Sequence, residues 1–283
     1  MNPSILLATD LDRTLLPNGA QPESALARPL FRRLVARPEI CLAYVTGRHP
    51  ALVEAAIAEY ALPRPAFVIA DVGASIDQLD AVAWQPRQDW VDAIAPDWGG
   101  LDHAHLVALL RNLADLTLQE ASKQGVFKLS YYAAPLDDPT DLLQRVQSRL
   151  AGSGTEVNLI WSIDETSATG LLDIRPAAAS KLHALEFLRT KLGIELQQTM
   201  FAGDSGNDMA VLVSDIPSVL VANAQDAVRA EATARANPAA LYLAVGGLFG
   251  MNGNYSAGIL EGLAHFMPET RAWLAPTTVQ TLF

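Results

Sequence analysis

The sequence predicts an α/β protein in which a doubly wound, Rossmann-like, mostly parallel sheet forms the core and an α+β cap domain is inserted into it. Short aliphatic runs recur along the chain, separated by stretches long enough for helices. Most of these runs lack strict alternation of polar and apolar residues, which is typical of strands covered on both faces. The middle of the chain differs, because polar and apolar residues alternate there as they do in a sheet with one polar face.

The core strands are expected at six aliphatic runs with helices between them, which together give a layered α/β arrangement. The stretch 181–192 (KLHALEFLRTKL) is one such helix, since its leucines recur at helical spacing. The tail is glycine-rich and then helical (AGILEGLAHF, 257–266), and we expect it to pack back on the core. The six predicted strands are residues 5–9, 41–46, 67–70, 170–174, 199–203 and 218–222.

The segment 84–169 is expected to form the cap domain, inserted between the third and fourth core strands. It holds two helical patterns, around 103–116 and 141–150, and two alternating stretches, 126–132 (VFKLSYY) and 156–163 (EVNLIWSI). The core domain would then consist of residues 1–83 and 170–283.

Composition narrows the classes of function. The chain has 283 residues and a net charge of −11, half of its residues are hydrophobic and 18% are charged, as in a globular protein. Nucleic acid is not an expected partner, because binding it needs clustered lysine and arginine. No membrane partner is expected either, because no apolar run approaches the roughly 20 residues of a span. The single cysteine, Cys41, is expected to fill the core, and with no secretion signal in evidence we expect a cytoplasmic protein.

Polar residues follow the predicted core strands, and ligands of open α/β sheets bind beyond these carboxyl ends. The first strand runs directly into two acidic residues (LLATDLDRTLLP, 6–17), and the fifth runs into GDSGND (203–208). The candidate site residues, in chain order, are Asp10, Asp12, Thr14, Thr46, Gly47, Arg48, Lys181, Asp204, Asn207, Asp208 and Asn223.

Single positions also have structural explanations. Thr46 could cap the following helix, and GDSGND could be a turn with a cap. Lys181 is harder to explain, because with Ser180 as N-cap it lies in the first helical turn, where the macrodipole disfavours a cation. Several carboxylates at one sheet edge need a cation between them to stay ionised. Oxygen ligands of this kind indicate Mg²⁺, which would also hold a substrate phosphate.

The motifs DLDRT (10–14), TGR (46–48), Lys181 and GDSGND resemble, in this order, the four motifs of the haloacid dehalogenase-like (HAD) phosphohydrolases. The resemblance spans nearly the whole chain. It is closer to the sucrose-phosphatase-like branch, through LAYVTGR (42–48), FKLSYY (127–132), GDSGND and AGILEGLAHF. That branch carries its cap after the second motif, where the insertion is expected.

The resemblance implies a Mg²⁺-dependent phosphatase that works through an aspartyl-phosphate. Asp10 would be the nucleophile, and Asp12 the general acid and base, for which we expect a raised pKa. The residues implied for phosphate binding are Thr46, Gly47, Lys181 and Asn207. Those implied for the metal are Asp10, Asp12 through its backbone carbonyl, Asp204 and, less directly, Asp208.

The implied substrate is a phosphorylated sugar, with sucrose 6-phosphate favoured. Alternation puts Lys128, Ser130 and Tyr132 on one face of a cap strand, where they would either bind the sugar or face solvent. Arg48 and Asn223 are weaker candidates for substrate contact. The segments 162–170 and 246–255 are expected to be enlarged loops able to shape the pocket, which leaves the particular ester open.

Other functions stay open at this point. Mannosylfructose phosphate, glucosylglycerol phosphate or mannosyl-phosphoglycerate would suit the same motifs, as would a phosphomutase reaction. A non-catalytic phosphate-binding subunit of a sugar synthase is an alternative of another class. The presence of Asp12 speaks against it, since a binding module has no use for a leaving-group acid. A sugar-phosphate synthase is an expected partner by resemblance alone.

Overall fold

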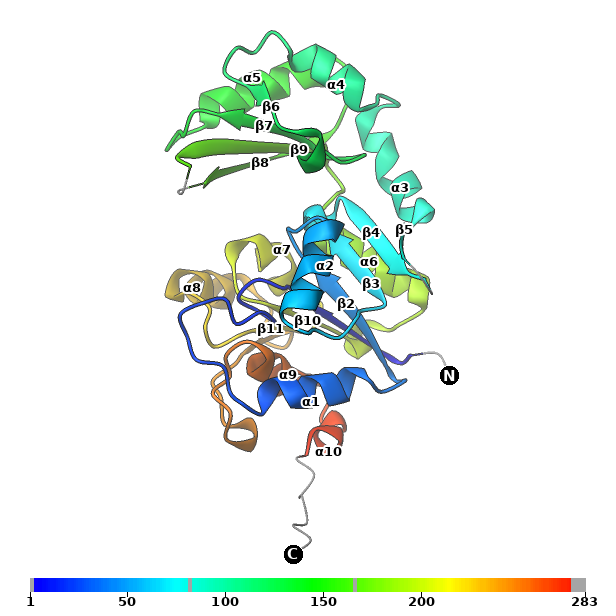
Figure 1. The fold of residues 1–283 in the computed structure, drawn as a ribbon, viewed down its shortest axis with the longest axis vertical. Helices are drawn as coiled ribbons and strands as arrows, with labels where there is room; N and C mark the ends of the chain where they lie inside the picture. The colour runs from blue at the N-terminus through cyan, green and yellow to red at the C-terminus, as the bar shows by residue number, and fades with distance from the viewer. Residues whose placement is uncertain (1–2, 81–82, 165–166, 276–283) are drawn as a thin grey trace, which may run out of the picture.

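An eight-stranded sheet runs through the larger part of the molecule, in the order β12-β11-β10-β1-β2-β3-β4-β5 (Figure 1). The computed structural model describes residues 3–80, 83–164 and 167–275. The first six strands in that order are parallel, and β4 and β5 extend the sheet as antiparallel neighbours. The strands are β1 (Ile5–Thr9), β2 (Ile40–Val45), β3 (Phe67–Ala70), β4 (Ser75–Leu79), β5 (Trp84–Pro86), β10 (Thr199–Gly203), β11 (Ser218–Leu220) and β12 (Leu241–Leu243).

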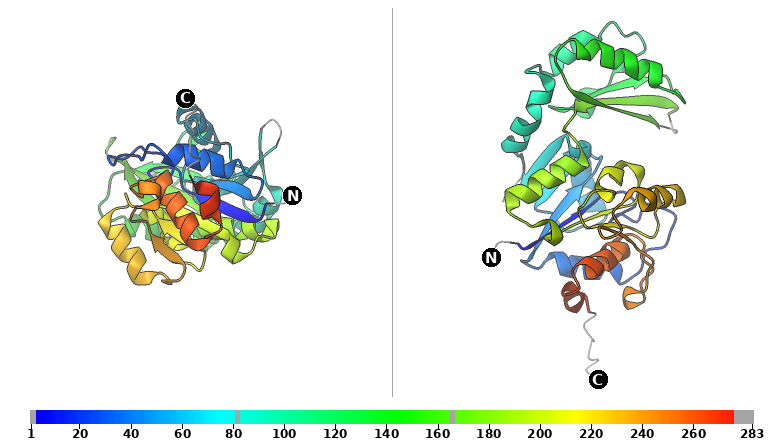
Figure 2. Two further views of the ribbon diagram at one scale, coloured as in Figure 1. Left: turned by 90° about the horizontal axis from the view of Figure 1, so that it is seen from below. Right: turned by 180° about the vertical axis from the view of Figure 1, so that it is seen from behind.

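Helices cover both faces of this sheet, which explains the unbroken apolar runs in its strands. Within β1, Ile5 and Leu7 pack in one hydrophobic cluster, whereas Leu6 and Ala8 pack in the other. The C-terminal helices lie with α1 on the first face (Figure 2). That face carries α1 (Ala27–Val35), α2 (Pro50–Glu59), α9 (Ser256–Phe266) and α10 (Thr270–Leu274), and the other carries α3 (Gln88–Ile94), α6 (Lys181–Leu192), α7 (Met209–Leu212) and α8 (Asp226–Arg235).

The second sheet is antiparallel and has the order β6-β7-β9-β8. Helices α4 and α5 cover one of its faces, and the other face is turned toward the larger body (Figures 1 and 2). This part contains α4 (His103–Leu110), β6 (Thr117–Leu118), β7 (Leu129–Ala133), α5 (Thr140–Ala151), β8 (Val157–Asp164) and β9 (Thr169–Pro176).

The predicted fold class is therefore confirmed, but one predicted core strand is wrong. Residues 170–174 belong to β9, which pairs with β7 and β8 and not with the main sheet. The adjacent leucines made this run look covered on both faces. In the structure only one side, with Leu172 and Ile174, packs under the helices, whereas Leu171 is half-buried.

The boundaries expected for the cap, residues 84 and 169, also do not coincide with those of the second sheet. β5 pairs with the main sheet, although residue 84 was expected to begin the cap, and β9 lies within the second sheet, although residue 170 was expected to return to the core. We propose a cap that begins after α3 and ends with β9.

Of the two segments expected to be enlarged loops, the first differs from expectation, whereas 246–255 is loop apart from a short 3₁₀ turn at Leu248–Gly250. Residues 162–164 belong to β8 and residues 169–170 to β9, so most of the first segment is strand, and residues 165–166 lie outside the described residues. The second segment packs against the loop that follows β1, where Asn252 Nδ2 donates to the Pro22 carbonyl at 2.8 Å and the Tyr255 hydroxyl donates to the Gln21 carbonyl at 3.1 Å.

Candidate active site

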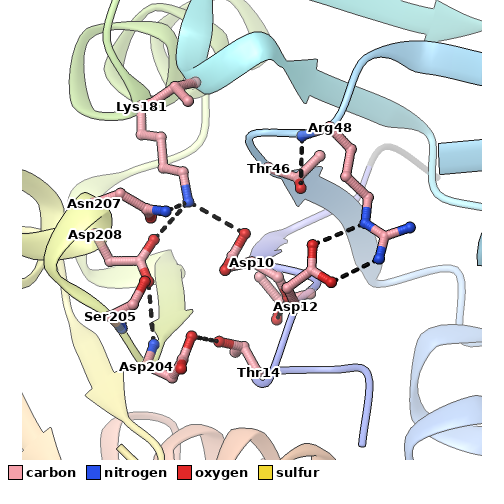
Figure 3. A network of polar contacts seen from close by, with 12 residues as sticks. Asp10, Asp12, Thr14, Thr46, Arg48, Lys181, Asp204, Ser205, Asn207 and Asp208 are labelled. Atoms are coloured by element: carbon pink, nitrogen blue, oxygen red, sulfur yellow. Dashed lines mark hydrogen bonds and ion pairs between the residues drawn. The ribbon is translucent and has the colours of Figure 1, made fainter. Parts of the chain in front are cut away.

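The carboxyl ends of β10, β1 and β2 lie side by side, and polar side chains from these ends converge there (Figure 3). Asp10 follows β1, Asp204 follows β10 and Thr46 follows β2. The chain leaves β1 toward β2 on one side and reaches β10 on the other, so this is the switch point at which open α/β sheets bind ligands. A cavity of about 280 Å³ opens here, lined by Asp10, Asp12, Arg13, Gly47, Arg48, Leu52, Asp204, Ser205 and Asn207.

Lys181 is buried behind the residues that line the cavity, and only 2% of it is exposed. Ser180 caps its helix by accepting from the His183 amide at 3.2 Å, so the helix begins where the sequence predicted. The Lys181 ammonium is 3.2 Å from Asp10 Oδ1, and it donates to Asp208 Oδ1 at 2.7 Å. Burial acts to lower the pKa of Lys181, but the carboxylates of Asp10 and Asp208 outweigh it and raise that pKa above its ordinary value. The anions that a cation at this helix start requires are thus present.

Three carboxylates form a buried cluster beside Lys181. Oxygens of Asp10, Asp204 and Asp208 all lie within 4.8 Å of one another. Burial, followed by the nearby Asp208 charge, raises the pKa of Asp204 to about 6. Burial raises the pKa of Asp10 to about 7, although Lys181 opposes the shift. Lys181 alone therefore does not supply enough positive charge to keep these carboxylates ionised. Their oxygens form a donor set that fits a hard divalent cation.

Asp208 is held in place by the loop that carries Asp204. Its Oδ2 accepts from the amides of Asp204 at 3.1 Å and Ser205 at 3.2 Å, while Oδ1 accepts from Lys181. A Cβ on Gly203 would lie 2.6 Å from the Asp208 carboxylate, so glycine is needed there. The alternative explanation of GDSGND as a capped turn is also correct, because Ser205 and Asp208 form a capping box. Both oxygens of Asp208 are thus engaged by the protein.

Asp12 differs from the sequence-based expectation. Arg48 donates two hydrogen bonds to its carboxylate, from Nε to Oδ2 at 2.8 Å and from Nη2 to Oδ1 at 2.6 Å. Asn18 Nδ2 donates to the same Oδ1 at 2.7 Å. Burial acts to raise the pKa of Asp12, but the hydrogen bonds and charge of Arg48 prevail and lower it. The expected raised pKa is therefore wrong for this arrangement, because Arg48 stabilises the ionised form.

Thr46 is buried and does not cap the following helix. Helix α2 begins at Pro50 with His49 as its N-cap residue, so the capping explanation for Thr46 fails. The Thr46 hydroxyl oxygen accepts from the Arg48 amide at 3.2 Å. A Cβ on Gly47 would meet only Val72, at an ordinary 3.6 Å. Packing within the protein therefore does not demand glycine at a position that lines the cavity.

Arg13 is a cavity-lining residue that the sequence reasoning missed. Its backbone has φ of 57°, which is uncommon for a residue other than glycine. Asn18 Oδ1 accepts from its amide at 2.8 Å, and Asn223 Nδ2 donates to its carbonyl at 2.6 Å. Its Nε is 3.6 Å from Asp204 Oδ2. The sequence did offer a signal for Arg13, because it lies in the motif DLDRT between the candidate residues Asp12 and Thr14.

Asn223 is placed elsewhere than expected. It bonds the Arg13 carbonyl on one side, and on the other its Oδ1 accepts from the Tyr255 amide at 2.8 Å. It is buried and does not line the cavity. The expectation of substrate contact is thus wrong for this arrangement, because its amide joins the loop after β1 to the start of α9. Thr14, in contrast, supports the cluster directly by donating to Asp204 Oδ1 at 3.0 Å.

The cap candidates lie on the face that the alternation predicts. Leu129 and Tyr131 pack under the cap helices, so Ser130 and Tyr132 point to the opposite face. The Ser130 hydroxyl donates to Asp173 Oδ1 at 2.6 Å, and the Tyr132 hydroxyl donates to Glu120 Oε2 at 2.8 Å. Lys128 donates to Asp71 Oδ1 at 2.9 Å. None of these three candidates lines the cavity at Asp10.

Comparison with known proteins identifies the family. The sequence pattern of the sucrose-6F-phosphate phosphohydrolases matches residues 3–267. The chain belongs to this family. It is thus a phosphatase, a phosphoric monoester hydrolase of the HAD superfamily, whose members generally need a divalent metal.

Several relatives illustrate the range of the family. A protein of Nitrosococcus oceani described as a HAD-like hydrolase is 52% identical over 277 residues, which cover 97% of this chain and 75% of that protein. Sucrose-phosphatase 2 of Nicotiana tabacum is 28% identical, over 92% of this chain and 59% of its own length. The mannosylfructose-phosphate phosphatase of Agrobacterium fabrum is 28% identical, over 79% of this chain and 85% of its own length. The chain thus spans well under two thirds of the tobacco enzyme.

A solved structure agrees with the fold. The sucrose-phosphatase of Synechocystis, determined in complex with sucrose and phosphate, superimposes with a TM-score of 0.69 at 25% identity. The match covers 93% of this chain and 98% of that one. Among the described residues, no helix combines the length and the apolar character needed to cross a bilayer.

Proposed function

We propose that this protein hydrolyses a phosphorylated disaccharide, with sucrose 6-phosphate as the first candidate, through a phosphoryl group carried on Asp10. One observation carries the proposal: Asp10 lies 3.2 Å from a buried lysine, within one carboxylate cluster, and lines a cavity that also holds Asp12. A nucleophile, an acid and a phosphate-binding cation are the groups that two-step phosphoryl transfer requires.

In the first step an Asp10 carboxylate oxygen attacks phosphorus. The bond from phosphorus to the sugar oxygen breaks, and Asp12 gives that oxygen a proton. In the second step Asp12 takes a proton from water, whose oxygen attacks phosphorus and breaks the bond to Asp10. Phosphate leaves, and both aspartates return to their starting state. General acid–base help of this kind typically contributes about 10²–10⁴-fold in rate.

Lys181 and Thr46 would hold the non-bridging oxygens of the phosphoryl group, where charge must be stabilised as it moves. Gly47 and Asn207 would border the same oxygens, since both line the cavity. Mg²⁺, held by Asp10, Asp204 and the Asp12 carbonyl, would neutralise charge on the phosphate. Asp208 would orient this set indirectly, because its own oxygens are already bonded to Lys181 and to the loop.

Asp12 must exchange its partner before it can act. A carboxylate paired with Arg48 is ionised and cannot donate a proton. We propose that Arg48 turns to the substrate phosphate, which raises the pKa of Asp12 by removing its counter-charge. Asp12 then takes up a proton from solvent, and this is the proton it gives to the leaving oxygen. This exchange assigns Arg48 a substrate-binding role.

The substrate assignment is supported by the family and by relatives that act on disaccharide phosphates. Mannosylfructose phosphate is the second candidate, because the match to the Agrobacterium phosphatase covers 85% of that protein. Glucosylglycerol phosphate and mannosyl-phosphoglycerate stay predictions, as do association with a sugar-phosphate synthase and a cytoplasmic location.

Phosphate release from a panel of sugar phosphates, with and without Mg²⁺, tests the proposal. We expect sucrose 6-phosphate to have the highest kcat/KM and Asp12→Asn to lose most of the activity. A higher kcat/KM for mannosylfructose phosphate would replace the substrate and keep the mechanism. A wild-type protein inert toward every ester would overturn the proposal in favour of a phosphate-binding subunit.

A further inference from the structure

The three-residue turn after β3, Asp71–Gly73, has an unusual backbone. Its residues have φ of 49°, 57° and 100°, so an aspartate and a β-branched valine both adopt the left-handed conformation. Such a backbone is strained, and it persists only where the surrounding structure holds it in place. The contacts that hold this turn in its strained conformation therefore indicate its role.

On one side the turn is joined to the second motif. The Asp71 amide donates to the Arg48 carbonyl at 3.1 Å, and the Val72 amide donates to the Thr46 carbonyl at 2.9 Å. The position of Thr46, proposed to hold the phosphate, is thus tied to the turn through the backbone.

On another side the turn packs against the start of α6. A Cβ on Gly73 would lie 2.3 Å from the carbonyl of Ser180 and 2.9 Å from the backbone nitrogen of Lys181. Only glycine allows this approach, and the backbone it touches is that of Ser180 and Lys181. One short turn therefore contacts both segments that carry the proposed phosphate-binding side chains.

The cap holds the turn with two cations. Arg175 of β9, only 1% exposed, donates from Nη1 to the Asp71 carbonyl at 2.8 Å. Lys128, next to β7, donates to Asp71 Oδ1 at 2.9 Å, and the two side chains are 15% and 14% exposed. A pair this far removed from water is costly to break on one side only.

We propose that this turn couples the cap to the floor of the site, the group of buried residues that includes Asp10, Thr46, Lys181 and Asp208. Lys128 and Asp71 would then be positioning residues for Thr46 and Lys181. The inference rests on the proposed function. It assigns Lys128 to turnover of any phosphate ester, whereas the sequence left it open whether Lys128 binds the sugar or faces solvent. Misplacement of binding groups by about 1 Å can cost on the order of 10²-fold in rate, so a small shift is sufficient.

The experiment compares p-nitrophenyl phosphate, which is too small to need sugar contacts in the cap, with sucrose 6-phosphate. We expect Lys128→Met and Asp71→Asn each to lower kcat on both esters, on the order of tenfold. The double variant, in which both charges of the Lys128–Asp71 pair are absent, should show no further loss. Lys128→Arg should restore kcat, and Lys123→Met, at an exposed cap lysine, should change nothing.

A readout independent of turnover accompanies the kinetics. Hydrogen exchange at the Asp71 and Val72 amides should be faster in Lys128→Met than in the wild type, with the melting temperature of the double variant close to that of the wild type.

The outcomes separate the two proposals. A wild type inert on both esters would mean that the proposed function has failed. An active wild type in which Lys128→Met raises only KM for the sugar phosphate, with kcat on p-nitrophenyl phosphate unchanged, would overturn the positioning role and make Lys128 a sugar ligand.

Discussion

The floor of the site and the underside of the cap use the same kinds of residue under different constraints. On the floor, Asp10, Lys181 and Asp208 are nearly inaccessible, and each is in contact with partners far away in the chain. On the cap, Tyr132 is partly exposed and bonds Glu120 twelve residues away. These three buried residues are therefore fixed before a substrate arrives, whereas Asp12 and Arg48 beside them are proposed to exchange partners. The cap side chains hold one another and must exchange partners to take up a ligand.

The largest expected effect is at Asp10 on the floor. Asp10→Asn keeps the shape but removes the nucleophile, so kcat should fall by at least about 10⁴-fold. The metal-free variant should nevertheless unfold at a higher temperature than the wild type at pH 8, because it has no carboxylate to ionise in a buried place. Phosphate release and thermal melting check both parts, and activity close to that of the wild type would contradict the assignment.

Lys181 should combine a loss of activity with a loss of stability. Lys181→Met leaves Asp10 and Asp208 without their shared counter-charge, which costs about 3–5 kcal/mol for a buried pair broken on one side. Removing a phosphate-binding cation should also lower kcat by about 10²–10³-fold. Lys191→Met on the same helix is the control, since Lys191 is 47% exposed and surface pairs contribute little. Equal urea midpoints for the two variants would refute the buried role.

The carboxylate cluster predicts how stability depends on pH without metal. Both carboxyls have folded pKa values raised from 3.8, to about 7 for Asp10 and about 6 for Asp204. Between about pH 4 and pH 7 the folded protein thus binds more protons than the unfolded chain, and stability falls as pH rises. Melting at pH 8 should lie at least about 3 °C below melting at pH 5, and Mg²⁺ should raise the pH 8 value. A chelated protein whose melting temperature does not fall over this range would argue against the cluster.

The smallest expected effect is at Tyr132 on the cap. Tyr132→Phe removes one neutral hydroxyl that could bond a sugar, so KM for sucrose 6-phosphate should rise about two- to tenfold. The KM for p-nitrophenyl phosphate should not change. Tyr131→Phe is the matched control, because that buried hydroxyl lies on the helix-covered side and has no hydrogen-bond partner among the residues that the structure describes. If both variants behave alike, the exposed face of the cap sheet does not contact the sugar.

Much of the floor could be predicted from the chain alone. The runs at 5–9, 67–70 and 199–203 coincide with β1, β3 and β10, because a strand covered on both faces leaves a strong apolar signal. The helix beginning at Lys181 was predicted from its cap and its leucine spacing. The gathering of Asp10, Thr46 and Asp204 followed, because parallel strands end at one edge. Lys181 joins them although it comes after β9 of the second sheet, so its place did not follow from this rule.

The cap was less predictable, and for a physical reason. The run 170–174 has the apolar content of a core strand, and which sheet it joins depends on long-range pairing that no local pattern encodes. The short strands β4 and β5 carry too little apolar signal to stand out. The place of β4 is set by its pairing with β3, and that of β5 by its pairing with β4.

The sequence by itself determined the layered fold, the order of the motifs and the convergence of acidic residues at one sheet edge, since strand periodicity and helix capping are local properties. Only the tertiary structure decided the partners: Arg48 on Asp12, Asn223 on the Arg13 loop, and Lys128 on Asp71. A hydrogen bond or ion pair forms only if its two atoms, carried by distant segments, are placed to within a few tenths of an ångström of the right separation. Such placement is fixed by packing.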